Sequence, residues 1–308
     1  MDAFQKFFEV ITIKCAVIYG KKSAQHHHFI EAGKEHFETV LGVPLENVRT
    51  VYEDGDTRLM YQDTNLCNFD CVLTRFLGDD LLYGEHIPEI LRNHRVYTQL
   101  DMDSLAIASN KFYSMKVLAE GGLPVPVSTY TLSTRETERF AERLGYPVVI
   151  KLISGYGGKG IMKAENESDL SPIIDTLTLF EQDICLQEYV ENPGEDVRIV
   201  VVGDKTYSYK RVGGEEEWRS NISAGGSREE YDAPEDMREI AVQASKLCGF
   251  DFCGVDIMVN EDGDYHIGEI NMSPGVAGVQ EVLGLDLAEE VMRFIKQKTV
   301  EKQSEEGL

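Results

Sequence analysis

Short apolar runs alternate with helix-like segments in the first third of the chain. The stretch Ile11–Tyr19 is mostly apolar, and Val48–Tyr52 and Phe69–Phe76 are further strand candidates. Between the first two, His28–Leu41 is predicted to be a helix. Strands that alternate with helices are typical of a parallel sheet covered by helices. Residues 1–105 are therefore predicted to form an α/β lobe built on a parallel sheet.

The middle of the chain has shorter elements separated by glycine and proline. A helix predicted over Asn110–Ala119 is stopped by Gly-Gly-Leu-Pro-Val-Pro, because glycine ends helices and proline does not continue them. The elements expected after it are helix Thr134–Leu144, strands Val148–Ile153 and Gly160–Lys163, helix Ser168–Leu179 and strand Ile184–Val190. We expect residues 106–190 to form a small α+β lobe of their own.

Strand patterns return after residue 190. The predicted elements are strands Val197–Val202 and Thr206–Val212, a loop over Gly213–Ser227, helix Pro234–Leu247, a strand pair described below and a last helix over Asp286–Lys298. Residues 191–300 are expected to form a third lobe. The charged end of the chain, residues 301–308, is expected to be disordered because it has few apolar side chains to bury.

The charge of the chain excludes some classes of partner. Fifty-four acidic side chains against 30 basic ones give a net charge of −24. The electrostatic field of so negative a chain repels nucleic acid and anionic membrane surfaces, so we expect neither as a partner. A nucleotide pocket stays compatible with this charge because it needs only a few well-placed cations.

The cysteines and the apolar runs indicate a cytoplasmic protein. The six cysteines are Cys15, Cys67, Cys71, Cys185, Cys248 and Cys253. No Cys-x-x-Cys spacing occurs, and a chain of 308 residues can bury a core without disulfides. Residues 1–10 lack the pattern of a secretory signal, and no apolar run approaches the roughly 18 residues of a membrane span. We expect reduced, buried thiols in an intracellular protein.

A predicted hairpin carries the most informative polar residues. Asp262-Gly263 is a preferred two-residue turn between the apolar segments 254–259 and 265–271. If it forms the turn, Asp256 lies directly opposite Glu269, and opposed residues share one face of the sheet. Asn271 shares that face because side chains alternate along a strand.

Two carboxylates and an amide oxygen within an apolar hairpin predict a magnesium site. Adjacent buried anions repel unless a cation lies between them. Oxygen ligands without His or Cys suit Mg²⁺, which completes its shell with water and substrate phosphates. The alternative is a hairpin whose acidic residues point into solvent. We favour the metal site because the segment after Asn271 continues as a tight Ser-Pro-Gly turn.

A glycine-rich loop between two strand candidates is the second feature. Its glycines let backbone N–H groups approach phosphates closely, although the pattern is neither a Walker loop nor a Rossmann fingerprint. The residues of interest here are Lys151, Gly155, Gly157, Gly158 and Gly160. Lys151 ends an apolar strand, an unusual place for a charge, and is a candidate phosphate ligand. A flexible glycine hairpin without a ligand is the alternative.

Several cations lie in or beside strands of this acidic chain. They are Arg198, Lys210, Arg211 and Arg219, the last of which opens the polar segment Arg219-Ser220-Asn221. Arginine can hold a phosphate or carboxylate in bidentate fashion, but each of these could also form an ordinary surface ion pair. The run His26-His27-His28 is a poor chelator because consecutive residues do not share a helix face. No Gly-x-Ser-x-Gly frame supports a covalent hydrolase.

Taken in order, these motifs resemble the ATP-grasp ligases, and among them the RimK-like glutamate ligases. The resemblance extends over about residues 101–298. It rests on Ser109-Asn110-Lys111, Pro147-Val148-Val149-Ile150-Lys151, Gln187-Glu188-Tyr189-Val190, Asp196-Val197-Arg198, Arg219-Ser220-Asn221, Gly254-Val255-Asp256 and Glu269-Ile270-Asn271 followed by Ser273-Pro274-Gly275. Residues 1–100 match only as a general amino-terminal lobe.

The resemblance implies a three-lobed ATP-grasp fold of α/β and α+β parts, with a parallel-sheet amino-terminal lobe and ATP held between the other two. It assigns Lys111 and Lys151 to phosphates, the glycine loop to a lid, Glu188 and Tyr189 to the adenine and Asp196 to the ribose. It assigns Arg219, Ser220 and Asn221 to the nucleotide. It assigns Asp256, Glu269 and Asn271 to two Mg²⁺ ions, with Mn²⁺ as a substitute. It assigns Arg198, Arg211 and Arg219 to the substrate and the acyl phosphate.

The family's reaction is phosphorylation of a carboxylate by ATP, then attack by an amine to give an amide, ADP and phosphate. Phosphoryl transfer needs positioning and charge neutralisation more than a protein nucleophile, which these residues could provide. Glutamate is the first candidate for the amino acid, with a carboxylate acceptor as second partner. A homo-oligomer is compatible with the sequence.

One departure bears on the acceptor. Family members that act on a ribosomal protein tail usually have a basic residue before Gly225-Gly226, where this chain has Ala224. A small molecule or another carrier is therefore an open alternative. Other open alternatives are ligation in cofactor synthesis, ligation on a carrier protein in lysine or arginine biosynthesis, and a nucleotide-binding regulatory protein.

Overall fold

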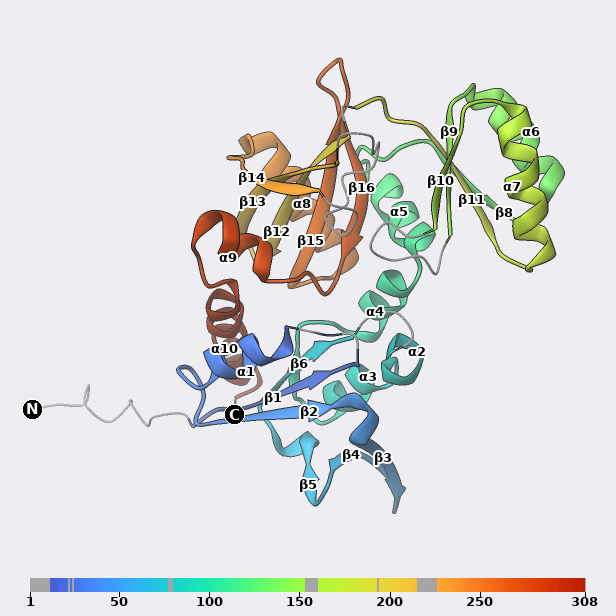
Figure 1. Cartoon of the computed structure of the whole chain (residues 1–308). Coiled ribbons are helices and arrows are strands. Elements are labelled where there is room, and N and C mark those ends of the chain that lie inside the picture. Colours follow the sequence, from blue (N-terminus) through green and yellow to red (C-terminus); the bar gives the residue numbers. More distant parts are fainter. Residues whose placement is uncertain are drawn as a thin grey trace, which may run out of the picture. The chain divides into compact units, whose positions relative to one another are not determined.

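The computed structural model describes residues 12–21, 23, 25–76, 80–152, 160–192, 194–214 and 226–307 (Figure 1). The chain divides into two compact units. The first comprises Met1–Leu105 and Asp286–Leu308, and the second comprises Ala106–Leu285. The expected division of the second unit between residues 190 and 191 stays a prediction.

The first unit contains the predicted parallel sheet. Its order is β2 (Thr39–Pro44), β1 (Lys14–Tyr19), β6 (Cys71–Arg75) and β7 (Tyr97–Thr98), and all three pairings are parallel. The middle of β1 is completely buried, as is expected for a central strand covered on both faces. The amino-terminal part of the fold prediction is confirmed.

The other elements of this unit are short. They are α1 (His26–Gly33), η1 (Leu45–Asn47), an antiparallel sheet of β3 (Val48–Glu53), β4 (Asp56–Tyr61) and β5 (Thr64–Asn65), η2 (Leu66–Asn68), α2 (Asp80–Gly84), α3 (Ile87–Asn93) and α4 (Met102–Ser109), which continues past residue 105. The predicted helix His28–Leu41 is wrong in its second half. The chain leaves α1 at Gly33 and enters β2 at Thr39, because the run Thr-Val-Leu-Gly-Val pairs with β1.

The last helix corrects two further expectations. Helix α10 (Leu287–Glu306) belongs to the first unit and not to a lobe spanning 191–300, and it runs through most of the tail expected to be disordered. Asp286 caps its first turn by accepting hydrogen bonds from the N–H groups of Ala288 and Glu289. Near its end, Gln303 Nε2 donates to Asp70 Oδ1 at 2.9 Å and Lys302 Nζ donates to the Val96 carbonyl at 3.3 Å. These hydrogen bonds offset part of the conformational entropy that is lost when the last turns of α10 become ordered.

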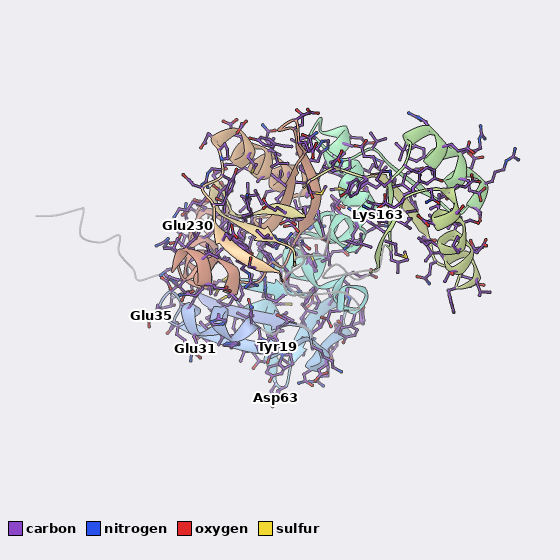
Figure 2. The ribbon with its side chains drawn as sticks, turned by 45° about the horizontal axis from the view of Figure 1, so that its top comes forward. Tyr19, Glu31, Glu35, Asp63, Lys163 and Glu230 are labelled. Carbon is purple, nitrogen blue, oxygen red and sulfur yellow. The ribbon has the colours of Figure 1, made fainter. Side chains whose placement is uncertain are left out.

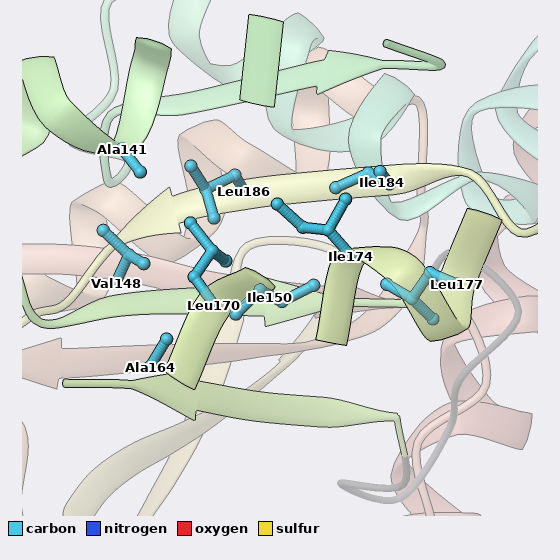
Figure 3. Close-up of a cluster of buried hydrophobic side chains, with 9 residues drawn as sticks. All are labelled: Ala141, Val148, Ile150, Ala164, Leu170, Ile174, Leu177, Ile184 and Leu186. Atoms are coloured by element: carbon cyan, nitrogen blue, oxygen red, sulfur yellow. The ribbon is translucent and has the colours of Figure 1, made fainter. Parts of the chain in front are cut away.

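The second unit begins with a four-stranded antiparallel sheet. Its order is β10 (Ile161–Ala164), β9 (Val148–Lys151), β11 (Ile184–Glu188) and β8 (Ser128–Thr131). Helices α6 (Thr134–Leu144) and α7 (Glu167–Leu179) contribute Ala141, Leu170, Ile174 and Leu177 to a core shared with the strands (Figure 3). Helix α5 (Lys111–Glu120) precedes this sheet, and Asn110 caps it.

A five-stranded antiparallel sheet follows. Its order is β14 (Ser227–Glu230), β13 (Lys205–Val212), β12 (Glu195–Val202), β15 (Phe252–Val259) and β16 (Tyr265–Asn271). Helices α8 (Glu235–Cys248) and α9 (Ala277–Leu283) complete the unit. This sheet carries most of the predicted site.

Among the described residues, no helix is both long enough and apolar enough to cross a membrane.

Candidate active site on the antiparallel sheet of the second unit

The β15–β16 hairpin places Asp256 directly opposite Glu269, as predicted, but through a different turn. Asn260 N donates to Asp264 O at 3.0 Å, and Gly263, with φ of 87°, closes a turn through its N–H to Asn260 O. The extra residue in this turn shifts the register by one, so that Val259 pairs with Tyr265. A bulge between Asp256 and Ile257 shifts it back. The predicted two-residue turn is wrong, while the predicted opposition is observed.

The opposed pair Asp256 and Glu269 is the start of a row of charged residues that crosses the sheet from strand to strand. Asp256 lies opposite Arg198 on β12, and Asp196, two residues before Arg198 and so on the same face, lies opposite Arg211 on β13. Arg198 makes a bidentate pair with Asp256, in which Nη2 donates to Oδ2 at 2.8 Å. Arg211 Nη2 lies 2.8 Å from Asp256 Oδ2, and Arg211 Nε and Nη2 each donate to Asp196 at 2.6 Å. Two aspartates and two arginines therefore alternate in one buried network.

Burial and charge act in opposite directions on this network. Burial alone would raise the pKa of Asp256, but Arg198 and Arg211 reverse the effect and lower the pKa below its usual value. Burial alone would lower the pKa of Arg211, which Asp256 and Asp196 raise instead. Asp256 is 6% exposed and Asp196 is 7% exposed. Asp256 is thus kept ionised by the two arginines in a setting with little water.

A second group of charges connects Glu269 to two lysines. Lys111, the first residue of α5, places Nζ 2.9 Å from Glu269 Oε1. Lys151 Nζ lies 3.5 Å from the carbonyl of Gly268. The side chains of Lys111, Lys151 and Glu269 all line one cavity of about 40 Å³. Burial lowers the pKa of Lys151, and the nearby Glu269 opposes this shift. The structure brings together the two lysines that the sequence assigned to phosphates.

The residues assigned to adenine lie at the end of β11 and just after it. Glu188 Oε1 accepts a hydrogen bond from Val127 N at 2.8 Å, and Glu188 N donates to Val127 O at 2.9 Å. The Tyr189 ring lies under Lys163 Nζ, 4.5 Å from its centre. Figure 2 labels Lys163, which belongs to β10. The nucleotide roles of Glu188, Tyr189 and Asp196 stay predictions.

Part of the predicted site lies outside the described residues. Gly160 is described, has φ of 81° and accepts a hydrogen bond from Leu152 N at 2.8 Å. The predicted residues that fall outside are Gly155, Gly157, Gly158, Arg219, Ser220 and Asn221, together with Ala224. Lys210, a cation singled out from the sequence, pairs with Glu195 at 2.7 Å.

Three residues near the network were not assigned from the sequence. Gly254 lies opposite Asn271, and a Cβ there would lie 2.9 Å from Arg198 Nη1, so a glycine makes room for the guanidinium. Arg228 lies opposite Arg211 on β14 and pairs with Glu281 at 2.5 Å. Ser273 Oγ is buried without a hydrogen-bond partner. The motif Asn-x-Ser-Pro-Gly could have drawn attention to Ser273, whereas only the strand pairing locates Arg228.

The chemistry of the donor set fits a divalent cation. The described residues contain no group of three or more His, Cys, Asp or Glu that could hold a metal. Asp256 and Glu269 supply two opposed carboxylates, and Asn271 is two residues from Glu269 on the same strand. Mg²⁺ accepts a few carboxylates together with phosphate oxygens. The metal assignment itself stays a prediction.

Comparison with protein families gives a match that covers most of the second unit. Residues 108–295 match the RimK-like ATP-grasp domain. A protein of Maridesulfovibrio salexigens called probable alpha-L-glutamate ligase is 32% identical over 241 residues, which cover 77% of this chain and 80% of that protein. A protein of the same name from Syntrophotalea carbinolica is 30% identical over 259 residues, which cover 83% of this chain and 85% of that one.

Solved structures agree with the fold prediction. The ATP-grasp ligase PsnB bound to a minimal precursor has a TM-score of 0.75 at 18% identity, covering 92% of this chain and 99% of PsnB. PsnB with a phosphomimetic precursor variant, Mg and ADP has a TM-score of 0.73 at 18% identity, covering 93% of this chain and 99% of PsnB. The ATP-grasp fold class is confirmed, whereas its division into three lobes stays a prediction.

Proposed function

The chain belongs to the RimK-like ATP-grasp family and is an ATP-dependent ligase that forms C–N bonds, and from this premise we propose that it joins the amino group of glutamate to an acceptor carboxylate. The names of its relatives suggest glutamate. The observation that carries the proposal is the row of charges across β13, β12, β15 and β16, in which Asp256 is opposed to Glu269 and held by two arginines.

Ligases of this family use ATP and magnesium, and we propose the residues that bind them. Asp256, Glu269 and Asn271 would hold Mg²⁺, in two ions or with Mn²⁺ as a substitute, and the metal would neutralise charge on the phosphates. Lys111 and Lys151 would contact phosphate oxygens, since both ammonium groups line the cavity that Glu269 also lines. Glu188 and Tyr189 would border the adenine, and Asp196 the ribose. Gly155, Gly157, Gly158, Gly160, Ser220 and Asn221 would complete the nucleotide site.

The arginines suit both the phosphoryl transfer and the acyl phosphate that it forms. Arg198 and Arg211 are fixed by Asp256 and Asp196, so their guanidinium groups are positioned before a ligand arrives. Such preorganised cations stabilise charge that develops on a transferring phosphoryl group or an acyl phosphate. We propose that Arg198, Arg211 and Arg219 serve this purpose. Water must be excluded while the activated carboxylate waits for the amine, because water would hydrolyse it.

The acceptor is proposed to be a small molecule or a carrier that is not strongly acidic. A net charge of −24 disfavours the approach of a polyanionic protein tail. We place the reaction in the cytoplasm, because all six cysteines are free and buried, which suits a reducing compartment.

Two measurements test this function. We expect phosphate release from ATP that requires L-glutamate and a metabolite extract, with a product heavier than its acceptor by one glutamyl residue in mass spectrometry. We also expect isothermal titration to show binding of a non-hydrolysable ATP analogue that requires Mg²⁺ and is lost in Asp256→Ala and Glu269→Ala. Glu195→Gln is the matched control, because Glu195 precedes Asp196 on β12 and points to the other face. Unchanged nucleotide affinity in both variants would remove the metal assignment.

A further inference from the structure

A third arginine lies at the edge of the charge network and has no role in the site described above. Arg228 is on β14, the outermost strand of the five-stranded sheet, and lies directly opposite Arg211 on β13. Opposed residues share one face of a sheet, so Arg228 extends the row that contains Arg211 and Asp196. Arg228 is half-buried, while the other residues of β14 are exposed. Figure 2 labels Glu230, two residues further along this strand.

The counter-charges of Arg211 and Arg228 differ in how far they are buried. Like charges that lie directly opposite each other in a sheet repel, so each guanidinium group needs an anion. Arg211 is held by Asp196 and Asp256, whose side chains are both 8% exposed. Arg228 is held through Nη1 by Glu281 of α9, whose side chain is 58% exposed. An ion pair with so exposed a partner contributes little to stability, so Glu281 can leave Arg228 at small cost.

One nitrogen of Arg228 has no acceptor within the chain. Its Nε is buried without a hydrogen-bond partner, although the side chain as a whole is 24% exposed. A buried donor without an acceptor costs free energy, which a ligand oxygen can recover. Guanidinium groups bind carboxylates through two parallel N–H groups, and Nε with a neighbouring Nη provides such a pair. Arg228 is therefore suited to bind a carboxylate that belongs to a ligand.

Helix α9 holds Glu281 beside the charge network. The helix packs against β13 and β14 (Figure 1). Its Gly278 lies directly against Tyr209 of β13, where a Cβ would overlap the phenol ring. Tyr209 in turn lies opposite Arg198. The pair of Arg228 and Glu281 thus adjoins the face of the sheet on which the proposed acyl phosphate would lie.

The position of β14 decides which carboxylate of an amino acid Arg228 can reach. The order β14-β13-β12-β15 puts three strand spacings, about 14 Å in total, between the backbone of β14 and that of β15, which carries Asp256. An amine that attacks the acyl phosphate must lie near Asp256 and its arginines. In glutamate the α-carboxylate is next to the amine, whereas the side-chain carboxylate is at the far end of the molecule. The side-chain carboxylate is therefore the one that extends toward β14.

We propose that Arg228 binds the side-chain carboxylate of the incoming amino acid and so selects glutamate over neutral amino acids. Glu281 occupies the guanidinium group until the substrate arrives, because its carboxylate is chemically the same group as the one it is exchanged for. The inference rests on the proposed function, which supplies glutamate as the amine substrate. It adds a specificity-determining residue at the edge of the sheet.

The test is binding of L-glutamate and of L-glutamine to the full chain by isothermal titration, with Mg²⁺ and a non-hydrolysable ATP analogue present. We expect Arg228→Met to weaken glutamate binding about tenfold or more, because it removes a charged bidentate donor. Glutamine binding should hardly change, so the preference for glutamate falls by the same factor. Arg228→Lys should recover part of the affinity, since it keeps the charge but not the paired N–H groups.

A matched control and an opposite substitution separate recognition from folding. Arg139→Met is the control, because Arg139 also pairs with a glutamate, Glu136 at 3.1 Å, but lies on α6 against the other sheet. It should leave both affinities unchanged. Glu281→Gln should tighten glutamate binding by up to about fivefold, because it removes the carboxylate that competes for Arg228. A gain of affinity cannot come from a misfolded variant.

Three results would overturn the inference. They are an unchanged preference for glutamate over glutamine in Arg228→Met, weaker glutamate binding in Glu281→Gln, and no glutamate binding to the unaltered chain. Phosphate release with L-glutamate and a metabolite extract distinguishes this failure from that of the proposed function. Release that persists in Arg228→Met with an unchanged KM for glutamate would leave the ligase function standing and remove only this site. Glutamate binding that depends on Arg228 without any glutamate-dependent release would remove the proposed function and keep the site.

Discussion

Asp256→Asn is the substitution that tests the charge network most directly. The change keeps the size of the side chain and one oxygen but removes the negative charge between Arg198 and Arg211. Both arginines are more than four-fifths buried by side chain, at 12% and 13% exposure, so water cannot replace the lost partner. Breaking a buried ion pair from one side costs about 3–5 kcal/mol, because an uncompensated charge is left behind. Asp196 still offsets part of the charge of Arg211, so we expect a loss near the lower end, about 3 kcal/mol.

The assay is urea unfolding of the full chain followed by circular dichroism, with free energies from linear extrapolation. The matched control is Asp232→Asn, which makes the same chemical change in an ion pair with Arg238 whose aspartate is 97% exposed. An exposed pair contributes about 0–1 kcal/mol, so the control should unfold almost like the unaltered chain. Hydrogen exchange of β12, β13 and β15 should rise only in Asp256→Asn. Equal losses of stability in the two variants would refute the account of the network as a buried, mutually dependent set of charges.

Three other outcomes are expected. Asn110→Ala should lower the free energy of unfolding by about 0.5–2 kcal/mol and weaken nucleotide binding, because Asn110 Oδ1 caps α5 immediately before Lys111. Unchanged nucleotide affinity by isothermal titration would contradict the idea that this cap positions Lys111. Cys248 and Cys253 should not react with a thiol reagent at pH 9 in the native chain, because burial raises the pKa of both to about 12 and leaves roughly one thiol in a thousand ionised. Rapid modification of Cys253 without denaturant, located by mass spectrometry, would count against this. Treatment with a chelator should leave the melting temperature unchanged, because Arg198 and Arg211 neutralise Asp256 without a metal; a fall of several degrees in calorimetry would indicate a structural metal.

Local sequence patterns predicted the elements that depend on neighbours along the chain. Helix α6 runs over Thr134–Leu144 as predicted, because Ser133 caps its start and Gly145 ends it. Strands β9, β11 and β12 lie where apolar, β-branched runs placed them, within a few residues at their ends. The family motifs likewise needed no coordinates, because their residues are recognisable in order along the chain.

The hairpin shows where local reasoning was partly sufficient. The sequence predicted that Asp256 and Glu269 face each other, and they do. It predicted the wrong turn, because the side chain of Asn260 accepts a hydrogen bond from Asp264 N and favours a longer loop. A bulge beside Asp256 then restored the predicted pairing of Asp256 with Glu269. No local sequence pattern predicted this bulge.

What the sequence determined by itself was the periodicity of the elements, the parallel amino-terminal sheet, the family and the identity of the charged residues. Only the tertiary structure decided which charges meet. Arg198 and Arg211 both contact Asp256 because β13, β12 and β15 are neighbours, although up to 58 positions separate the residues along the chain. The tertiary structure also assigned α10 to the first unit and turned the second half of a predicted helix into β2. Periodicity is set by the backbone geometry of adjacent residues, whereas these pairings depend on which distant surfaces bury apolar area together.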